Sequence, residues 1–194
     1  ATAGEIDTVD AAVTFHRAVT LTGNVAIDTV DVGGGATVEF KAAVDGTTAA
    51  TEDLQITAGT GDVTFGGDVG GTTRLGDLLV VSGDEQSYQA LTVDTLEIQD
   101  ATTSVTFNGD VNATGTIDVN SSGSILQKEQ VTAGTNLDYD AGTTLEIQKA
   151  ISVSGTVDLD ATTSITILED GDITAGGAVT LGAVKTGTVA TAGE

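Results

Sequence analysis

The chain has 194 residues, of which 29 are acidic and only 6 are basic, so its formal net charge is −23 at pH 7. Such a charge opposes binding to nucleic acid or to anionic membranes. No apolar run approaches the ~20 residues that cross a bilayer, so no membrane insertion is expected. Cysteine is absent, which excludes disulfides, and methionine is absent too, so we expect a processed protein or a piece of a longer one.

The N-terminal part repeats a short alternating motif. Three triplets, each followed after three residues by a valine, lie at 13–15, 38–40 and 63–65. This step of 25 residues indicates a solenoid, in which each repeat buries its apolar side chains against its neighbours. The extra residues at 33–35 and 46–51 are rich in Gly, Thr and Ala, and we expect them to leave the solenoid as corner loops. Tyr88 is predicted to take the position of the phenylalanines in a less regular coil.

From residue 100 onward the period shortens to 20 residues. One apolar column contains Val105, Ile125, Leu145 and Ile165. Each unit holds three apolar-x-apolar pairs separated by turn residues, which predicts three short strands and three corners. We therefore predict an all-β, right-handed parallel β-solenoid (a triangular β-helix) with about 8–9 coils of about 20–25 residues. It forms a single domain over 1–194, with longer coils at 6–99 and regular coils at 100–181.

The same alternation predicts the core. Aromatic residues make up only 3% of the chain, so stacked Val, Ile and Leu must build most of it. Gln127 falls in the column of Phe107 and Ile147, so we expect its amide either to be buried and hydrogen-bonded or to be displaced by a bulge. The side chains predicted to point inward are Val105, Phe107, Val111, Ile117, Val119, Ile125, Val131, Leu137, Tyr139, Leu145, Ile147, Ile151, Val157, Leu159, Ile165, Ile167 and Ile173.

Acidic residues recur at outward positions of the regular coils. The first row consists of Asp118, Asp138 and Asp158, extended by Glu97. The second row, expected at an adjacent corner, consists of Asp100, Asp140 and Asp160, with Asn120 between them. Carboxylates stacked at about 4.8 Å repel each other by roughly 0.9 kcal/mol even in water. Two interpretations stay open: Asp118, Asp138, Asp158, Asp140 and Asp160 bind Ca²⁺, which takes about six to eight oxygen ligands, or they form a solvated face that salt screens.

Catalytic motifs are nearly absent. His16 is the single histidine; it follows Phe15 in a predicted strand, and we expect it to point outward rather than to act as a base. The enzyme alternative is a β-helical polysaccharide lyase or hydrolase. Hydrolases need paired carboxylates in a cleft, however, and the basic residues that a lyase would place beside its acids are scattered here. We predict that the chain is not an enzyme.

Two segments carry a resemblance to a known family. GDVTFGGDVGGTTRLGDLLVVSG at 61–83 and QSYQALTV at 86–93 resemble the β-strand repeats of large bacterial filamentous-haemagglutinin-like exoproteins and adhesins. The resemblance implies a β-helical fold, secretion, and an extracellular stalk, adhesin or filament at the cell surface. A role in secretion itself is not implied, because no secretion domain is evident.

The two ends share a segment. ATAGE occurs at 1–5 and again at 190–194. Neither end shows the polar cap that an isolated solenoid needs, and uncapped strand edges invite pairing with another copy. We therefore expect copies to join head to tail in an extracellular filament or giant surface adhesin. The alternatives are a calcium-ordered surface-layer (S-layer) module and a module that binds a carbohydrate or another surface ligand.

Overall fold

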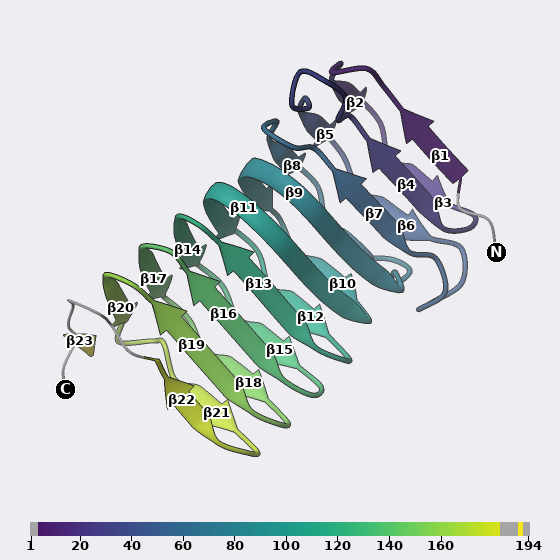
Figure 1. The fold of residues 1–194 in the computed structure, drawn as a ribbon. Coiled ribbons are helices and arrows are strands. Elements are labelled where there is room, and N and C mark those ends of the chain that lie inside the picture. Colours follow the sequence, from purple (N-terminus) through teal and green to yellow (C-terminus); the bar gives the residue numbers. More distant parts are fainter. Residues whose placement is uncertain (1–3, 183–189, 192–194) are drawn as a thin grey trace.

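The chain forms a parallel β-solenoid. A computed structural model describes residues 4–182 and 190–191, and every regular element in these residues is a β-strand. The strands pair in parallel from coil to coil, and nine of them lie in line along one face, so the chain winds through about nine coils (Figure 1). The predicted all-β parallel solenoid is confirmed, whereas its right-handed winding stays a prediction. We number the coils 1 to 9 from the N-terminal end.

The first face carries one strand from every coil. Its strands are β1 (Gly4–Asp7), β4 (Val25–Asp28), β7 (Leu54–Thr57), β9 (Asp77–Tyr88), β11 (Thr95–Phe107), β13 (Ile117–Ser121), β16 (Leu137–Ala141), β19 (Val157–Ala161) and β22 (Val179–Leu181). Because β9 and β11 are long enough to pass round a corner, this face continues into the second face as one 16-stranded sheet.

The second and third faces complete each coil. Beside the far halves of β9 and β11, the second face holds β2 (Val13–Phe15), β5 (Val38–Phe40), β8 (Val63–Phe65), β14 (Ser124–Gln127), β17 (Thr144–Ile147), β20 (Ser164–Ile167) and β23 (Ala190–Thr191). The third face holds β3 (Val19–Leu21), β6 (Val44–Gly46), β10 (Leu91–Val93), β12 (Val111–Ala113), β15 (Val131–Ala133), β18 (Ile151–Val153) and β21 (Ile173–Ala175). Isolated bridges at Val69 join β6 to β10, so the third face is continuous too.

The strand register follows the sequence periods. Ile117, Leu137 and Val157 are paired in successive coils, which is the 20-residue step. Val13, Val38 and Val63 are paired in the same way in the longer coils. The step widens once more near the C-terminal end, where Ile151 pairs with Ile173, because the chain makes an extra turn that Gly171 closes by donating its N–H to the carbonyl of Leu168 at 2.9 Å. The regular 20-residue coils therefore end earlier than the predicted residue 181.

The inserted residues leave the solenoid at corners, as predicted. Residues 33–35 lie between β4 and β5, and most of 46–51 lies between β6 and β7. Gly35 has a φ of +103°, and a Cβ there would collide with the backbone of Ala58 in the next coil. Only glycine fits this close approach of two corners.

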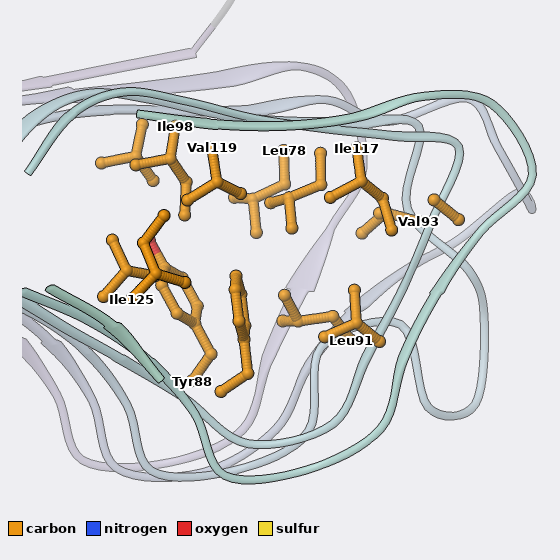
Figure 2. Close-up of a cluster of buried hydrophobic side chains, with 14 of the residues drawn as sticks. Leu78, Tyr88, Leu91, Val93, Ile98, Ile117, Val119 and Ile125 are labelled. Atoms are coloured by element: carbon orange, nitrogen blue, oxygen red, sulfur yellow. The ribbon is translucent and has the colours of Figure 1, made fainter. Parts of the chain in front are cut away.

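The interior is a stack of apolar columns. All the predicted core side chains are buried except Ile167 and Ile173, which are half-buried at the C-terminal end. Figure 2 shows such side chains meeting from the different faces, with Leu78, Ile98, Ile117 and Val119 opposite Tyr88 and its neighbours. Because each residue in a column repeats the position of the last, one coil covers the apolar face of the next.

An aromatic column runs through the first five coils. Tyr88 occupies the predicted phenylalanine position, and its ring lies between those of Phe65 and Phe107 at 5.5 Å from each. Phe15, Phe40 and Phe65 stack at 4.6 and 4.8 Å with nearly parallel planes. This spacing is close to the separation of neighbouring strands, so the rings repeat at the pitch of the coils.

Gln127 continues this column with a polar side chain. It is fully buried, and its amide nitrogen donates to the carbonyl oxygens of Glu129 at 3.0 Å and Lys149 at 2.9 Å. Its Cα partners are Phe107 in the coil before and Ile147 in the coil after, without a register shift. The buried and hydrogen-bonded alternative is therefore confirmed, and the bulge is not present.

Candidate functional site

The acidic residues form a grid on the first face. Its first row, from Glu97 through Asp118 and Asp138 to Asp158, consists of direct Cα partners in coils 5 to 8. The second row pairs Asn120, Asp140 and Asp160 on the same strands, two residues further along. These residues face outward because they alternate with the buried residues of β13, β16 and β19.

The second row differs from its prediction in position. Asp140 and Asp160 lie within strands of the first face, at the end of the face rather than at a separate corner. Asp100 stands beside an irregular step, since the pairing of β11 with β13 shifts register between Ile98 and Ala101.

A groove runs along the corner that follows the grid. It has a volume of about 470 Å³, and its polar walls include Asp100, Asn120, Asp140 and Asp160. Its lining also includes the small side chains at the ends of successive first-face strands, Ser121, Ala141 and Ala161. Because these lining residues recur at the same register position in successive coils, the groove runs along the rod.

The grid concentrates negative charge. Partial burial raises the pKa of Asp138 to about 6, and the charges of Asp140, Asp118, Asp158 and Asp160 add to the rise. Burial likewise raises the pKa of Asp140, with repulsion from Asp160 as the next cause. The proton is therefore held more tightly at the centre of the grid than on an ordinary aspartate.

A hydrogen bond stabilises the charged form of Asp118. Burial and the charge of Glu97 raise its pKa, but Asn120 opposes the rise by donating its amide N–H to Oδ1 of Asp118 at 2.9 Å. The amide in the second row thus partly offsets the repulsion in the first row.

No side-chain cation of the described residues neutralises the grid. The ion pairs between residues of 4–182 are Lys41–Glu39, Arg74–Asp94 and Lys149–Asp170, and none of them involves a grid residue. Within the same part of the chain, no three His, Cys, Asp or Glu side chains form a group that could hold a metal ion. Calcium binding by Asp118, Asp138, Asp158, Asp140 and Asp160 stays a prediction, which chelation tests below.

Other acids stabilise the corners, a role that the sequence analysis missed. Asp10 accepts N–H bonds from Asp31, Gly33 and Gly35 of the first inserted loop at 3.2, 2.6 and 2.9 Å. The N–H of Gly35 contributes most to holding the pKa of Asp10 below its ordinary value. The acids that accept a backbone N–H from the following coil in a similar way are Asp45, Asp53, Asp62 and Asp110. For Asp10 and Asp45, the signal in the sequence is an acid one coil before a Gly- or Thr-rich corner.

The residues weighed for catalysis do not come together in one place. His16 is exposed, as expected for an outward position after β2. The basic side chains of the described residues lie away from the walls of the corner groove, so the groove has carboxylates without the cations that a lyase would place beside them. That the chain is not an enzyme stays a prediction.

The fold and the grid define the protein as an acidic parallel β-solenoid repeat protein. Comparison with protein-family models, with curated proteins and with solved structures found no match. The resemblance of 61–83 and 86–93 to adhesin repeats therefore stays an expectation. In residues 4–182 and 190–191, no helix is long and apolar enough to cross a membrane.

Proposed function

We propose that the chain is a structural unit of an extracellular filament or giant surface adhesin, and that its units join end to end. The observation that supports this proposal best is the unbroken parallel ladder, in which all three faces continue from coil to coil. Such a ladder resists bending and pulling along its length because backbone hydrogen bonds hold successive coils together on three faces through coil 8, and on the first and second faces from coil 8 to coil 9.

The N-terminal coil has the edge that such joining requires. Among residues 4–182 and 190–191, strands β1, β2 and β3 each pair with one neighbour only, so that within this part of the chain their other edges carry unpaired N–H and C=O groups. An apolar opening of about 300 Å³ lies at this end, and Ile6, Phe15 and Val19, among others, line it. A further coil placed here would pair the free edges and bury the exposed ring face of Phe15.

The last described coil offers matching side chains. Val179 and Leu181 on β22 are 47% and 40% exposed. They belong to the same first-face columns as Gly4 and Ile6 of β1, so a head-to-tail junction in register would place Leu181 of one copy on Ile6 of the next. Most of the two ATAGE segments lies outside the described residues.

The test is a variant that blocks the free edge without disturbing the fold. The N–H of Val19 bonds to Ala43 in the next coil at 2.9 Å, so the N–H of Thr20, one residue on, points to the open edge. Thr20→Pro removes this donor, while the matched control Thr20→Ser keeps it. Electron microscopy and light scattering at moderate salt, which screens the net charge, should show rods of several units for the parent chain and for Thr20→Ser, and single units for Thr20→Pro. A parent chain that stays monomeric at its highest soluble concentration would refute end-to-end joining.

A calcium-ordered surface-layer module is the second candidate. The uncompensated grid of carboxylates on the first face favours it, because a divalent cation could bridge the grids of two copies. This candidate predicts two-dimensional lattices that form only when Ca²⁺ is added. The filament proposal predicts rods whose formation does not depend on Ca²⁺, so microscopy with Ca²⁺ and with a chelator separates the two.

A further inference from the structure

The aromatic column ends abruptly at coil 6. The rings of Phe15 to Phe107 stack through coils 1 to 5, and the next residue in that column is Gln127. Gln127 turns its amide nitrogen toward the corner carbonyls of Glu129 and Lys149 and leaves the ring position in coil 6 empty of an aromatic group.

A tyrosine from another face occupies this position. Tyr139 belongs to β16 in coil 7, two coils beyond Phe107 on β11, which corresponds to about 9.6 Å along the rod. Its ring nevertheless lies 6.1 Å from that of Phe107, with an angle of 15° between the planes. One or both of these rings must therefore tilt toward coil 6 for the stack to continue.

This arrangement leaves two polar atoms unpartnered in the core. Gln127 and Tyr139 are both completely buried, and neither Oε1 of Gln127 nor the hydroxyl of Tyr139 has a hydrogen-bond partner. A buried polar atom that gives up water without gaining a partner destabilises the folded state.

An equivalent pair in coil 4 is fully partnered. The hydroxyl of Tyr88 donates to Oε1 of Gln86 at 2.7 Å, and the amide nitrogen of Gln86 donates to the carbonyl of Asp100 at 3.0 Å. The chain can therefore accommodate a tyrosine and a glutamine inside the solenoid without unpartnered atoms, and coil 6 differs from coil 4 in this respect.

We propose that the step from Phe107 to Gln127 is a built-in yield point, at which coils 6 to 9 open as one unit while coils 1 to 5 stay folded. In a solenoid, stability is a sum of terms between neighbouring coils, so a single weak step divides the rod into blocks. The amide of Gln127 bonds to Lys149 in coil 7, which keeps coils 6 and 7 together. The break would then lie between coils 5 and 6, where the pairing of β11 with β13 and β14 and the stacking of Tyr139 on Phe107 must give way. If the chain serves as the filament unit proposed above, a pulled filament would lengthen by opening these coils before its junctions part.

Hydrogen exchange of the full chain in increasing denaturant tests the yield point. Amides of β14, β16, β17 and β19 should lose protection together, at lower denaturant than those of β5, β8 and β10. Tyr139→Phe removes one unpartnered atom and should raise the protection of β14 and β16 about five- to thirtyfold. The difference in protection between the first block (coils 1 to 5) and the second block (coils 6 to 9) should therefore become smaller. Tyr88→Phe, the matched control, instead leaves Oε1 of Gln86 without its donor and should lower the protection of the first block.

Three results would each refute the yield point. In the first two, all strands lose protection at one denaturant concentration, or protection declines evenly along the rod without a step between β11 and β14. The third is that Tyr139→Phe leaves the difference in protection between coils 1 to 5 and coils 6 to 9 unchanged. Should Tyr139→Phe fail to fold, Gln127→Ile, which copies Ile147 from the next coil, provides the same test. The assay reads coil opening in single chains, so its outcome is separate from that of the assembly experiment.

Discussion

Asp138 stands at the centre of the acidic grid, and its charge should destabilise the fold at neutral pH. We expect Asp138→Asn, which keeps the shape of the side chain but removes the charge, to stabilise the protein. The pKa of Asp138 rises from 3.8 to about 6 through burial and the four neighbouring carboxylates. One pKa unit corresponds to about 1.36 kcal/mol, so the full effect would be about 3 kcal/mol, and solvent screening of this half-exposed group reduces it to about 1 kcal/mol.

The sign follows from proton binding. Because the folded-state pKa is higher than the unfolded one, the folded protein binds more protons between about pH 4 and pH 6. The stability of the parent chain should therefore be highest near pH 4, as far as Asp138 is concerned, and should fall as the pH rises through 6. The gain from Asp138→Asn should be present at pH 7 to 8 and should vanish near pH 4.

Urea unfolding followed by circular dichroism at several pH values measures this gain. Burial is the larger cause of the raised pKa, so high salt should remove only the part of the gain that arises from repulsion between the partly exposed charges. The matched control is Asp77→Asn, which removes an exposed carboxylate of the same face outside the grid and should change the stability little. If Asp138→Asn has no effect or is destabilising at pH 7 in low salt, the charge of Asp138 does not destabilise the fold and the argument is wrong.

Three further predictions concern the core, the corners and the cation. Phe65→Ala removes a fully buried ring from the middle of the aromatic column and should lower the free energy of unfolding in urea by about 3–5 kcal/mol. Phe15→Ala, at the half-buried end of the column, should lower it clearly less, and equal losses would contradict the stacking. Asp45→Ala leaves the N–H groups of Thr72 and Thr73 without their shared acceptor and should cost about 1 kcal/mol, with Asp77→Ala as the exposed control. The interpretation of the grid as a solvated, salt-screened face predicts the same Tm with and without a chelator in calorimetric melting at low ionic strength, and a lower Tm in chelator would assign Ca²⁺ to the grid.

The sequence by itself determined the architecture, because the architecture depends on periods that recur along the chain. The 20- and 25-residue steps set which strands pair, and the two-residue alternation set which side chains point inward, so columns such as Val105, Ile125 and Leu145 could be assigned without coordinates. The position of Tyr88 and the first row of the acidic grid followed from the same register.

Only the tertiary structure decided how side chains meet where the repeat is imperfect. The stacking of Tyr139 on Phe107 joins residues of two different faces, and a one-dimensional period says nothing about neighbours on different faces. The same holds for Asp10, whose three N–H donors come from a loop one coil further on, and for the groove beside the grid, whose lining residues come from successive coils. Register is a property of the backbone and can be counted along the sequence, whereas hydrogen-bond partners, burial and pKa arise from distances across the interior and the corners, which only the folded chain defines.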